Sequence, residues 1–318
     1  MSTSGHRTCV YLSDTRGIHD RRWIGALESV GYTVLLEVPD TMEPDIPIVA
    51  GPLTTMNRDL LRLPNPVVGL SWGFDLHQLN AIDDTSWLPL LSGLIVDSIP
   101  TWEIATQAGV SAHRIAIIPW GIDLQLFNSQ APTKPSDKLQ ILTLRAHEDL
   151  YNVDTVITAV AELTLGGISC ELVVGNTGSL TERLVQLSAD LGLTNVDFIG
   201  RIEESDLPCL FDKADVYVSA AETDGTSVTL LQAMSMKVPV IVSDSPGNQA
   251  ILYDSHQKLS RGTLFPTGDS AALAQALRDF ALHRDAYGNL TEAAWEYVQN
   301  NADWGANVQR LIPLLNYS

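Results

Sequence analysis

The sequence is poor in basic residues and holds no long apolar run. It has 19 Lys and Arg residues against 38 Asp and Glu, a formal charge of −19, and its first 125 residues contain no lysine. Such a surface repels nucleic acids and anionic lipids alike. We therefore expect no nucleic-acid partner and no strong membrane signal, and a phosphate site would be a local exception to the overall field.

Cysteine is also scarce. Cys9, Cys170 and Cys209 stand far apart without CxxC spacing, which favours reduced, mostly buried thiols over a disulfide framework. No apolar run approaches the roughly 18 residues that would span a bilayer. The polar residues 1–8 lead into no long apolar core of the kind found in secretory signals. We therefore expect a cytoplasmic protein.

Short apolar runs alternate with helical segments along the 318 residues, a length that favours two domains. Runs of strand length occupy residues 9–12, 32–38, 46–50, 67–70, 94–96 and 114–118, and again 139–144, 170–174, 196–199, 216–219 and 238–242. Helices are expected at 23–30, 152–165, 180–191, 204–213, 226–236, 270–283 and in the tail, 291–315. This alternation indicates parallel sheets, and the proline-rich residues 129–138 read as the linker.

Residues 224–234, followed by the apolar run 238–242, form the most informative stretch. They read as a polar loop, a short helix and a buried strand. A helix N-terminus suits a phosphate because its N–H groups are unpaired and its dipole is positive. Gly225, Thr226 and Ser227 can offer such donors, while Asp224 and Gln232 are separated by roughly 12 Å of helix. The segment therefore predicts a clamp for a nucleotide sugar.

Ordered motifs across most of the chain resemble the retaining glycosyltransferases of family 4, which have the GT-B architecture. Residues 118–123 are similar to the family's IPNGVD segment, residues 214–219 to its ADVFVxPS segment, and residues 224–234 to the DGTSVSLLEAM variant of its E-x7-E element. Further similarities lie at residues 18–23, 71–75, 173–178, 196–202 and 302–304.

The resemblance implies an α/β fold with two Rossmann-like parallel-sheet domains facing each other across a cleft. Residues 1–130 would form a shortened, acceptor-side domain, residues 131–302 the nucleotide-sugar domain, and residues 303–318 a helix crossing back to the first. It implies a hexosyltransferase-type enzyme that transfers a sugar from a nucleoside-diphosphate sugar with retained anomeric configuration. The donor would be a co-substrate, without a further cofactor or metal, and the acceptor a small molecule, a glycan or a protein.

The resemblance also implies roles for single residues, each of which has a structural alternative. Arg145 corresponds to the phosphate-binding arginine, the alternative being a surface ion pair with Glu148 or Asp149. Leu150 stands where the family has a lysine, so a second cation is missing, and the neighbouring Tyr151 is one candidate to compensate.

Asp224 corresponds to the acid that contacts the donor sugar, although an aspartate there would also cap the helix. Gln232 replaces the glutamate that binds the ribose, the alternative being a solvated helix residue. Gly175 ends a strand, and Gly200, Arg201 and Ile202 lie where the family's backbone holds the nucleobase. Gly225, Thr226 and Ser227 complete the donor-binding set.

In the first domain, His19 and Asp75 join Arg145 and Asp224 as candidate catalytic residues. Either could contact the acceptor or the transferred sugar, and His19 could relay a proton. A lone histidine in a turn is more often structural or solvated.

Two other functions stay open. A non-catalytic GT-B subunit that stabilises an active transferase would fit Leu150 and Gln232, so a partner subunit or a homodimer is a possible assembly. A nucleotide-sugar epimerase fits less well, because no acid and base pair is evident in the two domains.

Overall fold

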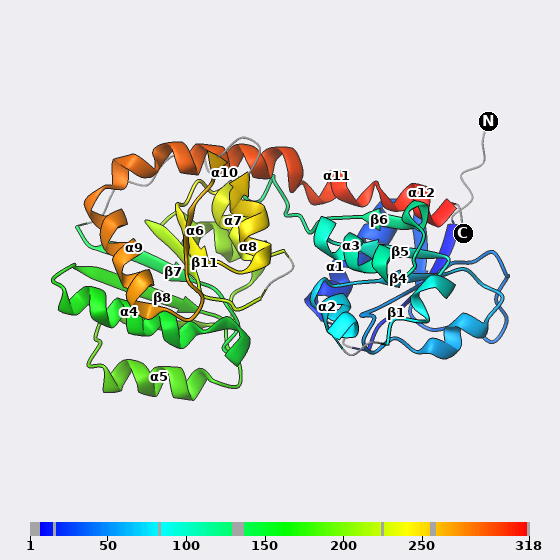
Figure 1. The fold of residues 1–318 in the computed structure, drawn as a ribbon, viewed down its shortest axis with the longest axis horizontal. Helices are drawn as coiled ribbons and strands as arrows, with labels where there is room; N and C mark the ends of the chain where they lie inside the picture. The colour runs from blue at the N-terminus through cyan, green and yellow to red at the C-terminus, as the bar shows by residue number, and fades with distance from the viewer. Residues whose placement is uncertain are drawn as a thin grey trace. The chain divides into compact units, whose positions relative to one another are not determined.

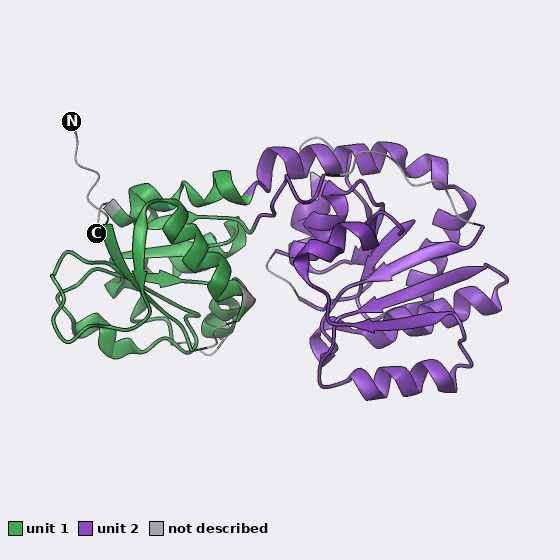
Figure 2. Cartoon of the chain, turned by 180° about the vertical axis from the view of Figure 1, so that it is seen from behind, with its two compact units in different colours: residues 1–120, 304–318 green, residues 121–303 purple. Residues whose placement is uncertain are grey.

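The computed structural model describes residues 7–14, 17–81, 84–128, 137–223, 226–254 and 259–316. The chain divides into two compact units (Figures 1 and 2). Unit 1 consists of Met1–Trp120 and Trp304–Ser318, and unit 2 of Gly121–Asp303. Each is a Rossmann-like α/β unit built on a six-stranded parallel sheet.

The sheet of unit 1 has the strand order β2-β1-β3-β4-β5-β6, with every neighbouring pair parallel. Its strands are β1 (Arg7–Leu12), β2 (Tyr32–Leu35), β3 (Ile48–Ala50), β4 (Val67–Leu70), β5 (Gly93–Val96) and β6 (Ile115–Ile117). Its helices are α1 (Ile18–Ser29), α2 (Phe74–Ala81), α3 (Ile99–Gln107), α11 (Trp304–Val308) and α12 (Leu311–Asn316). Strands β3, β4 and β5 are buried at every residue, as expected of parallel strands covered on both faces.

Aromatic packing holds the C-terminal segment on unit 1. The Trp304 ring stacks on Trp120 with a centroid distance of 5.6 Å, and both rings meet the edge of Trp23. The Arg22 guanidinium lies over Trp120 and Trp304, an arrangement that adds cation–π attraction. The four side chains thus fasten α11 to α1.

The sheet of unit 2 has the order β14-β11-β10-β7-β8-β9, again parallel throughout. Its strands are β7 (Leu139–Thr143), β8 (Cys170–Gly175), β9 (Val196–Gly200), β10 (Val216–Ser219), β11 (Val240–Ser243) and β14 (Thr263–Phe265), and a small hairpin joins β12 (Tyr253–Asp254) to β13 (Leu259–Ser260). Its helices are α4 (Val153–Leu165), α5 (Thr181–Asp190), α6 (Leu207–Phe211), α7 (Val228–Ser235), α8 (Pro246–Leu252), α9 (Ser270–Leu282) and α10 (Gly288–Asn301). Two separate apolar clusters pack in this unit, one including α4 and α9 and the other α7 and α10.

The chain enters unit 2 at Gly121, ahead of the predicted boundary at residue 130. Ile122 and Phe127 are fully buried in the cluster that includes α7, and the Ser235 hydroxyl donates to the Phe127 carbonyl over 2.7 Å. These contacts assign the residues after Trp120 to unit 2. Most of the predicted linker, residues 129–136, lies outside the described residues.

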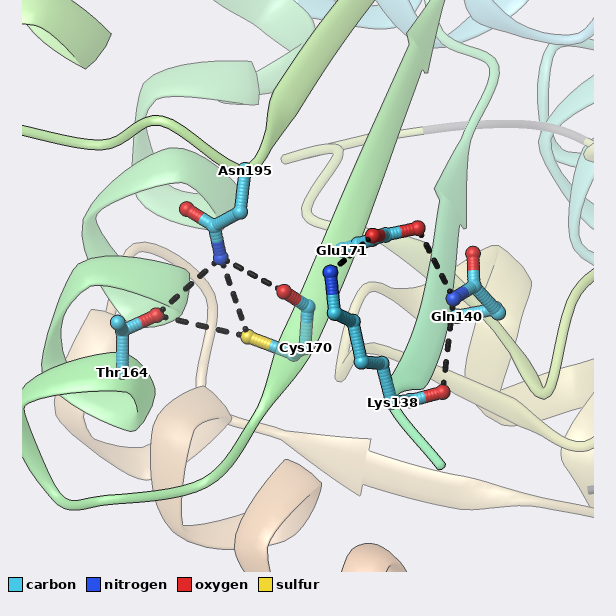
Figure 3. A network of polar contacts seen from close by, with 6 residues as sticks. All are labelled: Lys138, Gln140, Thr164, Cys170, Glu171 and Asn195. Carbon is cyan, nitrogen blue, oxygen red and sulfur yellow. Dashed lines mark hydrogen bonds and ion pairs between the residues drawn. The ribbon is translucent and has the colours of Figure 1, made fainter. Parts of the chain in front are cut away.

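Polar contacts tie the starts of the strands in unit 2 (Figure 3). Lys138 pairs with Glu171 over 2.7 Å, and the Asn195 amide donates to the Cys170 carbonyl over 2.8 Å. Burial raises the pKa of the Cys170 thiol, so this cysteine is held as an unreactive thiol. Cys9 is buried as well, whereas Cys209 is exposed.

Element boundaries differ from the predictions mainly at helix starts. Helix α1 begins at Ile18 instead of residue 23, because the Asp20 carboxylate binds the Gly17 N–H and the Tyr11 hydroxyl at its first turn. Helices α3 and α8 open with a proline in their first turn. Neither helix was among those expected from the sequence, although the first helical turn tolerates a proline.

Candidate functional site

Arg145 lies just beyond the carboxyl end of β7 and is 8% exposed. Its Nη1 donates to the Ser227 hydroxyl over 2.8 Å and to the Thr229 hydroxyl over 3.3 Å. Its guanidinium carbon lies 4.3 Å from the centroid of the Tyr151 ring. The structure thus brings together three of the predicted donor-site residues, Arg145, Tyr151 and Ser227, at one edge of the sheet.

The loop that carries Tyr151 is fastened to the loop after β10. Asn152 adopts a left-handed conformation, φ 45°, which ends the turn before α4. Its amide donates to the Ala220 carbonyl over 3.4 Å, and the Glu222 N–H donates to the Leu150 carbonyl over 2.9 Å. Parallel strands end at the same edge of a sheet, so these bonds fix the relative positions of the two loops.

Glu148, one of the two alternative partners for Arg145, accepts hydrogen bonds from the Ser179 N–H over 2.8 Å and from the Ser179 hydroxyl. These bonds lower the pKa of Glu148. The Nη1 atom of Arg145 donates to two uncharged hydroxyls. A Cβ added at Gly178 would lie 2.4 Å from the His147 carbonyl oxygen, so the loops after β7 and β8 are in close contact.

Three further candidates meet at the ends of β8 and β9. A Cβ on Gly175 would lie 2.5 Å from the Ile202 Cδ1 atom, so the glycine is what allows this side chain to pack there. Gly200 has φ 71° and accepts a 2.6 Å hydrogen bond from the Asn176 N–H. Arg201 is exposed. The backbone role of these residues toward a nucleobase stays a prediction.

Gln232 lies on α7 and is 2% exposed, so the alternative of a solvated helix residue is wrong. Its Oε1 atom is buried without a hydrogen-bond partner among the described residues, as are the hydroxyls of Thr143 and Ser245. Buried polar atoms are normally paired, and leaving one unpaired costs about 1–3 kcal/mol. Gln232 therefore marks a place where a hydrogen-bond donor would be stabilised.

The predicted clamp segment is only partly described. Ser227 is buried immediately before α7, and Thr226 is half-buried. Asp224 and Gly225 lie outside the described residues, so the expected sugar-binding acid and the adjacent glycine stay predictions. Helix α7 spans Val228–Ser235, shorter than the predicted 226–236.

His19 and Asp75 belong to unit 1, where both are held by neighbouring residues. The His19 ring packs against Trp72 and Trp120, with centroid distances of 5.3 and 4.8 Å. Asp75 is fully buried. Its carboxylate accepts bonds from the Ser71 hydroxyl and from the N–H groups of Leu53, Trp72 and Leu76. These contacts explain an aspartate in the first turn of α2, and its part in catalysis stays a prediction.

Sequence reasoning missed Asp97, which directly follows β5 and is 3% exposed. Its Oδ1 atom accepts bonds from the Thr101 and Ser98 hydroxyls, whereas Oδ2 has no hydrogen-bond partner in the described part of the chain. Burial raises the pKa of this carboxyl group. The available signal was an acid directly after an apolar strand.

Two kinds of feature are absent from the described residues. They contain no group of three or more His, Cys, Asp or Glu side chains placed to hold a metal ion. None of their helices combines the length and the apolar character needed to cross a membrane.

Comparison with solved structures identifies the fold class. HepE from Anabaena, crystallised with UDP and glucose, superposes with a TM-score of 0.74 and 15% identity, covering 98% of this chain and 100% of that chain. Sucrose-phosphate synthase from Thermosynechococcus elongatus gives a TM-score of 0.72 and 18% identity, covering 98% of each chain. The two Rossmann-like units therefore constitute a GT-B fold.

The family follows from sequence. The profile of the family described as "Glycosyl transferases group 1" matches residues 125–297, and the chain belongs to this family. The amylovoran biosynthesis glycosyltransferase AmsK from Erwinia amylovora is 25% identical over 240 residues, which cover 72% of this chain and 58% of AmsK. The chain spans about half the length, or less, of the curated relatives it matches.

Proposed function

We propose that the protein is a retaining, metal-independent glycosyltransferase that moves a sugar from a nucleoside-diphosphate sugar to an acceptor. The observation that carries this proposal is the position of Arg145, whose buried guanidinium meets Ser227 and Thr229 at the carboxyl edge of the unit 2 sheet. A planar guanidinium binds two phosphate oxygens at once, and ligands of such sheets bind at this edge. The family to which the chain belongs supports the same conclusion.

The work of the site is electrostatic. Arg145 would stabilise the negative charge that develops on the leaving diphosphate, with Thr226 and Ser227 as further donors. The leaving phosphate would accept the proton of the attacking acceptor hydroxyl on the same face of the sugar, which retains the anomeric configuration. Gly200, Arg201 and Ile202 would hold the base through the backbone, and Gln232 would bind the ribose.

The first donor class to test is a UDP-sugar, because the similar protein HepE has been crystallised with UDP-glucose. We leave the acceptor as a small molecule, a glycan or a protein. Calorimetry should show UDP binding. When candidate acceptors are added, the protein should release UDP from UDP-glucose or another common UDP-sugar. Transfer with inversion of the anomeric centre would contradict the retaining mechanism.

Arg145→Ala should weaken UDP binding by about 10- to 100-fold, the range expected when a hydrogen-bonded charge is removed. The matched control is Arg183→Ala, because Arg183 lies on α5, where it lines a 210 Å³ cavity with Asp149 and Glu222. Equal UDP affinity in the two variants would show that Arg145 does not bind the nucleotide. A folded wild-type protein without affinity for UDP, GDP or ADP would refute the proposed donor site.

A second candidate function is that of a non-catalytic partner of an active transferase. Leu150, which stands in place of the family's lysine, is 40% exposed, and Gln232 carries no charge where the family has a glutamate. A pocket that has lost its function would show no nucleotide affinity, and the protein would instead stabilise an active transferase by binding to it. Copurification from the native source, followed by an assay of the partner alone and in complex, distinguishes the two functions.

A further inference from the structure

A chain of hydroxyl groups leads from Arg145 into the core of unit 2. The Thr229 hydroxyl accepts the 3.3 Å bond from Arg145 and lies 2.7 Å from the Tyr217 hydroxyl. The Ser227 hydroxyl, which also binds Arg145, lies 3.5 Å from that of Thr229. The sequence pattern identified neither Tyr217 nor Thr229, because a tyrosine within the buried run 216–219 reads as a core residue.

The sheet and the surrounding core hold the Tyr217 side chain in place. It lies on β10, which pairs with β7 on one side and β11 on the other, and its side chain is fully buried. Its ring packs near Phe211, with a centroid distance of 6.1 Å. A buried tyrosine ring supplies packing while its hydroxyl needs a polar partner, and Thr229 is such a partner. The phenol oxygen therefore has a position set by the sheet.

Thr229 is the more adaptable member of the pair. In a helix, threonine divides between two χ1 rotamers. Thr229 is the second residue of α7 and is half-buried. The bond to Tyr217 favours the rotamer in which the threonine hydroxyl reaches Arg145.

We propose that Tyr217 is a positioning residue for the phosphate-binding arginine: through Thr229 it holds the guanidinium of Arg145 in the orientation that receives a diphosphate. This inference rests on the proposed function, since it assigns the ligand of Arg145 as the diphosphate of the donor. Tyr217 acts at a distance and does not touch the substrate.

The test measures UDP binding by calorimetry in Tyr217→Phe, which keeps the ring and removes the hydroxyl. We expect a rise in Kd of about three- to tenfold, the range for one uncharged hydrogen bond. Thr229→Val should give a similar rise, and the double variant should be no weaker than the weaker single variant, because both act through one connection. Tyr297→Phe is the matched control, since this tyrosine contacts Arg261 instead of Arg145, and it should bind UDP like the wild type.

The outcomes separate the inference from the proposed function. If the wild type binds none of UDP, GDP and ADP, the proposed function fails. If the wild type binds UDP and Arg145→Ala weakens the binding, but Tyr217→Phe and Thr229→Val leave it unchanged, only the role of Tyr217 fails. Additive losses in the double variant would also overturn the connection. Should Tyr217→Phe not fold, Thr229→Val and Thr229→Ser test the step through Thr229: serine restores the hydroxyl and should recover affinity, and an unchanged affinity in Thr229→Val would overturn the proposal.

Discussion

The guanidinium of Arg145 lies 4.3 Å from the centre of the Tyr151 ring, so the arginine has an aromatic face on one side and hydroxyl groups at its Nη1 atom. A cation over an aromatic ring is attracted by its quadrupole without being neutralised. Tyr151 therefore covers the guanidinium on one side, while Ser227 and Thr229 hold its Nη1 atom.

This relationship predicts the effect of replacing Tyr151. Tyr151→Phe should retain UDP affinity, because the ring face is kept. Tyr151→Leu should raise the Kd by about two- to fivefold, which corresponds to a partly exposed cation–π contact. Calorimetry on the two variants checks the prediction, and equal affinities would show that the ring contributes packing alone.

Replacing Gln232 by glutamate should have opposite effects on the free and the liganded protein. The new carboxylate would be buried at a position that is 2% exposed, which lowers the free energy of unfolding by about 1–3 kcal/mol at neutral pH. Two ribose hydroxyls would compensate it in the complex. Thermal unfolding should show a lower Tm without ligand and a larger rise with UDP than in the wild type, whereas 2′-deoxy-UDP should give a smaller rise. Equal shifts for both nucleotides would place Gln232 away from the ribose.

Gly178→Ala should destabilise unit 2 and weaken UDP binding. The added Cβ would lie 2.4 Å from the His147 carbonyl oxygen and 2.7 Å from its carbonyl carbon, so the loops after β7 and β8 must separate. Such overpacking costs about 1–3 kcal/mol. Gly25→Ala, on an open face of α1 with no atom near the new Cβ, is the control and should be neutral or stabilising. Urea unfolding of the two variants decides the matter, and equal midpoints would contradict the prediction.

Asp97 should make the stability of unit 1 depend on pH. Burial raises its folded pKa, although the bonds from Thr101 and Ser98 and the charge of His77 act in the opposite direction. The folded state then binds the proton more tightly than the unfolded state. The contribution of Asp97 to the free energy of unfolding is therefore complete below the ordinary carboxyl pKa, about 4. It is lost as the pH rises through the raised pKa of the folded state. Asp97→Asn should flatten the pH dependence in that range. Asp59→Asn, at an exposed surface position, should leave it unchanged in urea titrations between acidic and neutral pH.

One of the three cysteines should react rapidly in the native protein. Cys209 is exposed, whereas burial raises the pKa of Cys9 to about 12 and also raises that of Cys170. A thiol reagent should therefore label one site under native conditions and all three in denaturant, because the thiolate is the reactive form. Cys209→Ser should abolish the rapid phase. Fast labelling that persists in this variant would show that a buried thiol is accessible.

The apolar runs predicted the strands of both six-stranded sheets except β14, because buried parallel strands are continuous stretches of Val, Ile and Leu. Helix starts were less predictable, as with α1, where the side chain of Asp20 determines the first turn. The sequence indicated Arg145 and Ser227 separately. Their hydrogen bond depends on the pairing of β7 with β10, which no local pattern encodes.

The remaining site residues show why pattern reasoning fails at certain positions. One alternative interpretation placed Gln232 on the solvated face of its helix. The packing of α7 within unit 2 buries the residue instead. Thr229 acquires its role through bonds to Arg145 and Tyr217, and Tyr217 through Thr229, whereas in the sequence they are an ordinary helix residue and an ordinary core residue. Asp97 differs, because an acid directly after a buried strand was visible in the sequence.

The stacked tryptophans give the two units different spectroscopic properties. Six of the seven tryptophans, including Trp23, Trp120 and Trp304, belong to unit 1, and Trp295 alone belongs to unit 2. Rings in such close contact exchange excitation energy, so tryptophan emission and near-ultraviolet circular dichroism report chiefly on unit 1 and on the seating of its C-terminal segment. Arg145 and its hydroxyl partners lie in unit 2, which contributes little to the tryptophan emission. A single tryptophan introduced near the site would therefore be a selective optical probe of it.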